Sequence, residues 1–238
     1  MMNLDELKHL ASDSAKNHQV YRKVRISRRI FPGIDKDNSI ILDAYKAVNE
    51  VIKTKGSILP AAEWLADNFH MIEEQIKDIY HSIPKSYYSD LPVLKTGSNK
   101  GYPRTYAIAV DIISHTDGIV DEDIIINYIE EYQRQVPLMA CELWSVPLML
   151  KIALIKKISS ICANIMVTQY ERLKADVWAE RLLNALEGST GEFQRVISSH
   201  EDEIEFINSA YGERLLRKLR DYGSSSAPII RWIDGKLA

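Results

Sequence analysis

The feature that most constrains the fold is the spacing of apolar residues between about residues 58 and 83. Leu65, Phe69, Ile72, Ile76 and Ile79 recur three or four residues apart, which places them on one face of an α-helix. A proline near the start costs little, because the first turn of a helix leaves its amide hydrogens unpaired, and a proline after the end stops the helix. The pattern therefore predicts a long helix with one buried face.

Similar spacing recurs along the rest of the chain, and no segment alternates convincingly over the length of a strand. The pattern predicts further helices at about 4–20, 37–55, 104–115, 121–135 with Asp121 as its cap, 138–186 as one or two long helices, and 201–222. Pro147 lies inside one of them, where a missing donor predicts a kink or break near Leu143 and Trp144. The expected fold is all-α, an irregular multi-helix bundle or array with one long ordered loop at about 84–103.

One main helical domain is expected over residues 1–222. A Gly-Ser-Ser-Ser segment then begins a short terminal helix at 223–238, which carries the apolar residues Ile229, Ile230, Trp232 and Ile233. With no later segment to cover it, this helix is expected to be part of a docking interface with downstream domains.

Composition excludes several classes of protein. The net charge of −3 over 238 residues disfavours a nucleic-acid binder, and the 46% of hydrophobic residues suffices for a core. Cys141 and Cys162 are too few for a disulfide framework or a cysteine-only zinc site and fit a reducing cytoplasm.

The polar, acidic start of the chain predicts no export signal. The most apolar stretch, 136–167, contains Glu142, Lys151, Lys156 and Lys157. Each charge would cost about 2.5–3.5 kcal/mol at a bilayer centre, so a buried helix is expected there rather than a membrane span.

Three segments carry a family resemblance: PAAEWLADNFHMIEEQI at 60–76, GYPRTYAIAVDIISHTDG at 101–118 and YQRQVPLMACELWSVPLML at 132–150. In this order and spacing they resemble the helical region that precedes the membrane-embedded glycosyltransferase of bacterial cyclic β-1,2-glucan synthases, with the core of the resemblance at about 58–167. The resemblance implies a parent polypeptide that transfers glucose from UDP-glucose at the inner face of the bacterial inner membrane. The transmembrane helices and acidic metal-binding motif of that enzyme are not in this sequence, so a non-catalytic scaffold or regulatory module is expected, docking on the catalytic or membrane domain.

No residue is predicted to be catalytic, and no metal or cofactor is expected. Charged residues at helical spacing on 63–74 fit a solvated face, and His115 followed by Gly118 fits a helix C-terminus, with no nucleophile elbow or phosphate loop elsewhere. We expect a buried hydrogen-bonded network rather than a catalytic or metal site. Its expected members are Asp67, Asn68, Glu74, Gln75, His115 and Asp117.

Aromatic residues around the long loop have the composition of a sugar-binding platform, and equally that of a core. The candidate carbohydrate contacts, with β-1,2-glucan as the sugar that the resemblance implies, are Trp64, Tyr87, Tyr88, Tyr102 and Arg104. A carbohydrate-binding module is therefore one alternative function, and a free-standing helical adaptor for another protein is a second.

One basic run remains, and its members are Arg22, Lys23, Arg25, Arg28 and Arg29. It fits a solvated connector between helices. The functional alternative is an anionic membrane surface, where each such charge contributes about 1 kcal/mol of attraction.

Overall fold

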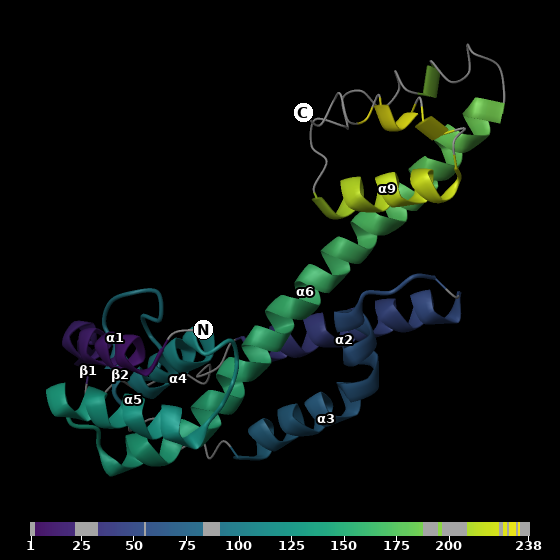
Figure 1. Ribbon diagram of the computed structural model, residues 1–238. Helices are drawn as coiled ribbons and strands as arrows, with labels where there is room; N and C mark the ends of the chain where they lie inside the picture. The colour runs from purple at the N-terminus through teal and green to yellow at the C-terminus, as the bar shows by residue number, and fades with distance from the viewer. Residues whose placement is uncertain are drawn as a thin grey trace. The chain divides into compact units, whose positions relative to one another are not determined.

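The computed structural model describes residues 3–21, 33–54, 56–82, 91–187, 195–196, 209–223, 226–227, 229–231 and 233. These residues form an all-α structure, as predicted (Figure 1). The chain divides into two compact units, one formed by residues 1–55 and 60–163 and the other by residues 56–59 and 164–238. This division differs from the expected one, in which residues 1–222 make up the main domain.

The first unit contains α1 (Leu4–Asn17), α2 (Ile34–Lys53), α3 (Pro60–Ser82), α4 (Arg104–His115), α5 (Glu122–Gln135) and the first part of α6 (Ala140–Glu187). Helix α1 packs on α5 and α4, and α2 packs on α3 (Figure 1). Eight of the twelve residues of α4 are buried, so this helix is the centre of the unit. A helix that is apolar nearly all round must be covered on every side.

Local signals account for where the helices begin and end. Asn3 and Glu6 form a reciprocal capping box at α1, and the Asp121 carboxylate caps α5, as its position in the sequence predicts. Helix α4 ends at His115 with Thr116 as its C-cap, and Gly118 at φ 80° donates its amide hydrogen to the carbonyl of Ile113. This confirms the predicted helix C-terminus.

Helix α3 confirms the opening prediction. Leu65, Ile72, Ile76 and Ile79 are buried, and the ring of Phe69 stacks on Tyr45 of α2 with 3.9 Å between centroids. The apolar stripe of α3 therefore faces α2.

Residues 91–103 cover one edge of the first unit. Strand β1 (Val20–Tyr21) pairs antiparallel with β2 (Val93–Leu94), and the chain then turns through Gly101 at φ 86°, a conformation that favours glycine. The amide of Gly101 donates to the carbonyl of Leu94. This described part of the predicted long loop is thus hydrogen-bonded along its length and leads directly into α4.

Helix α6 continues through Pro147 as one helix, which corrects the predicted break near Leu143 and Trp144, while the kink that was its alternative stays a prediction. Pro147 removes one hydrogen bond near the start of the helix, at the carbonyl of Leu143. The side chains of Leu143 and Pro147 are both exposed, so water can reach this part of the helix.

The second unit packs the last part of α6 on α9 (Ser209–Asp221), which crosses α6 in Figure 1. Its core includes Trp178, Leu182 and Leu215 together with Ile229 and Ile233. Ile229 and Ile233 are therefore covered within this unit, contrary to the expectation that they form an unpartnered docking helix.

Candidate functional site

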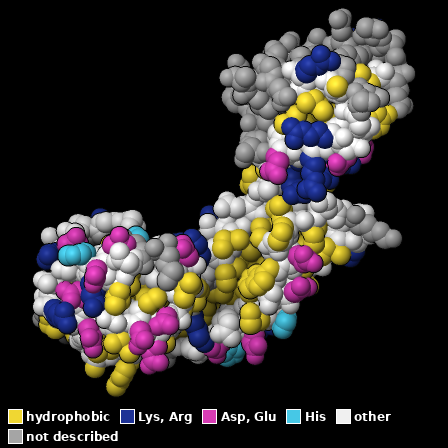
Figure 2. Space-filling model, viewed as in Figure 1, with side chains coloured by type: hydrophobic (Ala, Val, Ile, Leu, Met, Phe, Trp, Pro, Cys, Tyr) yellow, Lys and Arg dark blue, Asp and Glu magenta, His cyan; other side chains and the backbone are white. Residues whose placement is uncertain are grey.

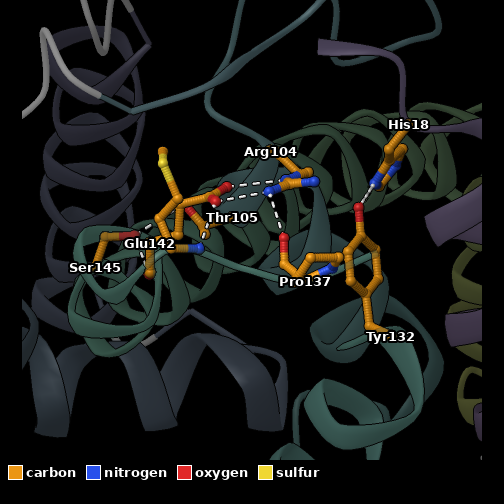
Figure 3. Close-up of polar contacts among 8 residues, drawn as sticks. His18, Arg104, Thr105, Tyr132, Pro137, Glu142 and Ser145 are labelled. Carbon is orange, nitrogen blue, oxygen red and sulfur yellow. Dashed lines mark hydrogen bonds and ion pairs between the residues drawn. The ribbon is translucent and has the colours of Figure 1, made fainter. Parts of the chain in front are cut away.

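A buried ion pair joins the start of α4 to the start of α6. Arg104 Nε donates to Glu142 Oε1 at 2.8 Å and Arg104 Nη2 donates to Oε2 at 2.6 Å, while Nη2 also lies 3.3 Å from the carbonyl oxygen of Pro137 (Figure 3). Burial lowers the pKa of Arg104, but the hydrogen bond and charge of Glu142 outweigh it and hold that pKa above its ordinary value. The bidentate geometry is the arrangement in which a buried pair best offsets its desolvation.

The same carboxylate holds the first turn of α6. Glu142 Oε2 accepts from the backbone N–H of Met139 at 3.0 Å, one of the donors that a helix start leaves unpaired. The Ser145 hydroxyl donates to the Glu142 carbonyl oxygen at 2.6 Å and lies 2.9 Å from Thr105 Oγ1 of α4. These bonds fix the beginning of α6 against α4.

Tyr132 of α5 extends the network towards α1. Its hydroxyl is 2.9 Å from His18 Nδ1, and the Arg104 guanidinium lies 5.9 Å from the centre of its ring (Figure 3). Burial lowers the pKa of His18; the Asp111 charge raises it and the Arg104 charge lowers it further. Burial also raises the pKa of Tyr132, so its hydroxyl stays protonated.

Asp111 joins three helices of the first unit. Its Oδ2 accepts from the hydroxyl of Ser14 in α1 at 2.7 Å and from that of Tyr128 in α5 at 2.8 Å. The charged groups at the centre of this unit thus bond to one another or to neighbouring hydroxyls. We infer a structural role for this network, because each polar group that it buries has a hydrogen-bond partner.

An apolar surface lies on the turn of α6 that this network supports. Trp144 is 78% exposed, although its neighbours Glu142, Ser145 and Val146 are buried. The exposed apolar residues at this end of α6, here called the Trp144 face, are Met139, Ala140, Leu143, Trp144 and Pro147. Figure 2 shows hydrophobic side chains gathered along α6 on its visible face.

The predicted carbohydrate contacts that the structure describes lie on different elements. Trp64 lies on α3 with half of its surface exposed, whereas Tyr102 is half-buried and stacks on Tyr106 with 5.0 Å between ring centroids. Arg104 is buried against Glu142, so the structure removes it from this group of candidates. Tyr87 and Tyr88 lie outside the described residues.

The buried polar network is not where the sequence places it. The side chains of Asp67, Glu74 and Asp117 are exposed, whereas those of Asn68, Gln75 and His115 are half-buried. Asn68 donates to the carbonyl oxygen of Trp64 at 2.8 Å, and His115 Nδ1 lies 2.8 Å from the carbonyl oxygen of Asp111, so both bonds stay within one helix. The exposure of Asp67 and Glu74 follows from their spacing, because carboxylates that repeat at helical spacing on α3 lie on the solvent-exposed face of that helix.

Two signals in the sequence mark the network that does form. Arg104 and Asp111 are the charged residues of an otherwise apolar helix, and Glu142 follows a similarly apolar start of α6. Single charges on mostly apolar helices are retained where they are paired. The predicted basic run, whose members are Arg22, Lys23, Arg25, Arg28 and Arg29, lies outside the described residues.

Neither a metal site nor a membrane span is found in the part of the chain that the structure describes. No three His, Cys, Asp or Glu side chains come close enough there to hold a metal ion. Among the same residues, no helix combines the length and the apolar character that crossing a bilayer requires.

The fold and the network define an all-α protein with a fully bonded polar centre and an exposed aromatic residue beside it. No protein-family model matches the sequence. The chain is similar to the cyclic beta-(1,2)-glucan synthase NdvB of Rhizobium meliloti (strain 1021), with 33% identity over 199 residues. The match covers 83% of this chain and 7% of that relative, and it confirms the resemblance to cyclic β-1,2-glucan synthases.

Proposed function

We propose that this chain is a non-catalytic scaffold or regulatory module of a glucosyltransferase similar to cyclic β-1,2-glucan synthases. In this proposal it docks on the catalytic or membrane domain of that protein, at the inner face of the bacterial inner membrane. The similarity to NdvB supports the class of protein, and the chain spans only 7% of that relative. Most of such a synthase therefore lies outside the matched stretch and is available as the docking partner.

The observation that carries the proposal is the exposure of Trp144. A tryptophan that is 78% exposed forgoes most of the free energy available from burying its ring. Tryptophans are also the residues most enriched among those that dominate binding at protein interfaces. The Trp144 face lies within the third segment that resembles the synthases, at 132–150.

The network beneath the Trp144 face supports the same role. Glu142, Ser145 and the backbone of Met139 are all bonded in the first turns of α6, so the exposed residues between them are held in one orientation. Preorganisation of this kind lowers the entropy that binding must overcome. A rigid, apolar helix start is a suitable docking element.

The test is binding of this chain to the catalytic and membrane part of a cyclic β-1,2-glucan synthase, purified in detergent. We expect Trp144→Glu to weaken the association at least tenfold, because it places a charge at the centre of the contact. Trp64→Glu is the matched control: it makes the same change at an exposed tryptophan of α3 and is expected to bind like the wild type. Equal binding by the wild type and Trp144→Glu would rule out this docking face.

A carbohydrate-binding role is the alternative, and the exposed indole of Trp64 is the observation that favours it. Saturation-transfer NMR with β-1,2-gluco-oligosaccharides addresses it directly. A signal that Trp64→Ala removes and Trp144→Ala preserves would assign the sugar to α3.

The second alternative, a free-standing adaptor, would instead bind a protein other than the synthase through the Trp144 face.

A further inference from the structure

The second unit contains a small cavity of about 90 Å³ that is lined by three arginines. Its lining residues come from α6, α9 and the short segment before α3, and they are Leu59, Thr168, Arg172, Ala210, Glu213, Arg214 and Arg217. Figure 2 shows Lys and Arg side chains gathered over α9 and the adjoining stretch of α6, at the upper right. Three guanidinium groups therefore meet at one opening.

Charges at the cavity do not cancel. Arg214 forms a bidentate pair with Asp176, at 2.7 Å between Nε and Oδ1 and 2.9 Å between Nη2 and Oδ2, which neutralises that guanidinium. Among the described residues of the lining, Glu213 is the one carboxylate, and it faces the two remaining charges of Arg172 and Arg217. Within the described residues, the three arginines and two carboxylates leave an excess of one positive charge.

Arg172 has an unmet hydrogen-bonding need. Its Nη2 donates to the Ser57 hydroxyl at 3.0 Å, but its Nε is buried and has no acceptor among the residues that the structure describes. A buried donor without an acceptor costs about 1–3 kcal/mol, so an acceptor placed there is strongly favoured. Burial and then the charge of Arg214 lower the pKa of Arg172, while the charges of Asp176 and Glu213 raise it in part.

The wall opposite α9 is held in place. Gln169 Nε2 donates to the carbonyl oxygen of Ser57 at 3.1 Å, next to the bond from Arg172 to the Ser57 hydroxyl. Two side chains of α6 thus form hydrogen bonds to Ser57, and these bonds position Leu59 at the cavity. The cavity is consequently formed by connected elements of one unit.

We propose that this cavity binds a phosphate-type oxyanion, with Arg172 Nε and the Arg217 guanidinium as its donors. Guanidinium groups present planar, paired donors that match the oxygens of phosphate, and an oxyanion would supply both the missing acceptor and the missing negative charge. Pockets that enclose whole ligands measure about 300–1,000 Å³, so this one takes a phosphate group rather than an entire substrate. The site is independent of the Trp144 face.

The first experiment is a titration of the ¹⁵N-labelled chain with inorganic phosphate, following the Nε–H resonance of Arg172 at constant ionic strength set with chloride. We expect a saturable shift, and a dissociation constant raised about tenfold by Arg217→Gln. Arg220→Gln is the matched control, because it removes the same charge from an exposed residue of α9 that does not line the cavity.

A second arm identifies the source of the phosphate group. Sedimentation with phosphatidylcholine vesicles, with and without phosphatidic acid, tests whether a lipid headgroup occupies the cavity. Pelleting that needs phosphatidic acid and is lost in Arg217→Gln but kept in Arg220→Gln assigns a headgroup, whereas a saturable phosphate shift alone assigns a free oxyanion. The proposal is wrong if both arms are negative, or if Arg217→Gln and Arg220→Gln behave alike.

Discussion

Arg104 and Glu142 lie 38 residues apart in the chain and form a bidentate ion pair with 5% and 0% of their side chains exposed. The pair links the most buried helix, α4, to the longest, α6. Because the Glu142 carboxylate also accepts from the Met139 amide, it holds the backbone that carries the Trp144 face. Stability and the orientation of the Trp144 face thus depend on one side chain.

Removing one partner of this pair is expected to be strongly destabilising. Glu142→Ala leaves a buried, uncompensated guanidinium and should lower the free energy of unfolding by about 3–5 kcal/mol. Urea denaturation followed by circular dichroism measures the loss. The control is Glu73→Ala, which breaks the exposed pair with Lys77 and should cost less than about 1 kcal/mol. Similar losses for the two variants would show that burial of the pair is not decisive.

Ile229 belongs to the core of the second unit, so truncating it should weaken that unit. Ile229→Ala is expected to cost about 2–5 kcal/mol, because the side chain is 0% exposed and its removal leaves a cavity. Ile161→Ala makes the same change at a residue that is 44% exposed and should stay within about 0.5 kcal/mol of the wild type. Thermal unfolding compares them, and an unchanged midpoint for Ile229→Ala would place this residue outside the core.

His18 makes stability depend on pH in the weakly acidic range. Its pKa is lower in the folded chain than the ordinary 6.5, chiefly through burial, so the unfolded chain binds the proton more readily. The stability contributed by neutral His18 is present above about pH 6.5 and is lost as the pH falls below it. Urea denaturation at pH 7 and pH 5 should therefore show a smaller drop for His18→Gln than for the wild type. His70→Gln, at an exposed position, should retain the wild-type drop.

The two cysteines should differ in reactivity. Burial raises the pKa of Cys162 to about 11, and alkylation requires the thiolate. At pH 8 we expect iodoacetamide to modify Cys162 at least tenfold more slowly than the half-buried Cys141, as followed by mass spectrometry of the intact chain and its peptides. In urea the two rates should converge. Equal rates in the folded chain would contradict the burial of Cys162.

The helices could be predicted because their signals are local. The apolar stripe of α3 and the Asp121 cap of α5 depend on residues within a few positions of each other, and the structure places both as expected. Helix α2 begins at Ile34 rather than at Asp37, an ordinary uncertainty at a helix end. Pro147 does not break α6, because the other hydrogen bonds of this long helix outweigh the one that the proline removes.

The polar centre could not be predicted, because its partners are distant in the chain. Arg104 and Glu142 each stand out as charges among apolar residues, yet nothing in the sequence pairs them. The predicted network instead included Asp67 and Glu74. Their spacing on one helix is that of a solvent-exposed face. The burial of Ile229 and Ile233 could not be predicted for the same reason, because the residues that cover them belong to α6 and α9 and are distant in the chain.

The packing of α1 on α5 has a consequence for synthesis of the chain. The buried face of α1, formed by Leu7, Ala11 and Ala15, meets a helix that ends at Gln135, more than one hundred residues later. At translation rates of about 5–20 residues per second, the first helix waits roughly 5–25 s for its partner. Helix α1 can therefore pack on α5 only after the chain has been made to about residue 135, and a ribosome that stalls before α5 leaves the apolar face of α1 exposed to chaperones.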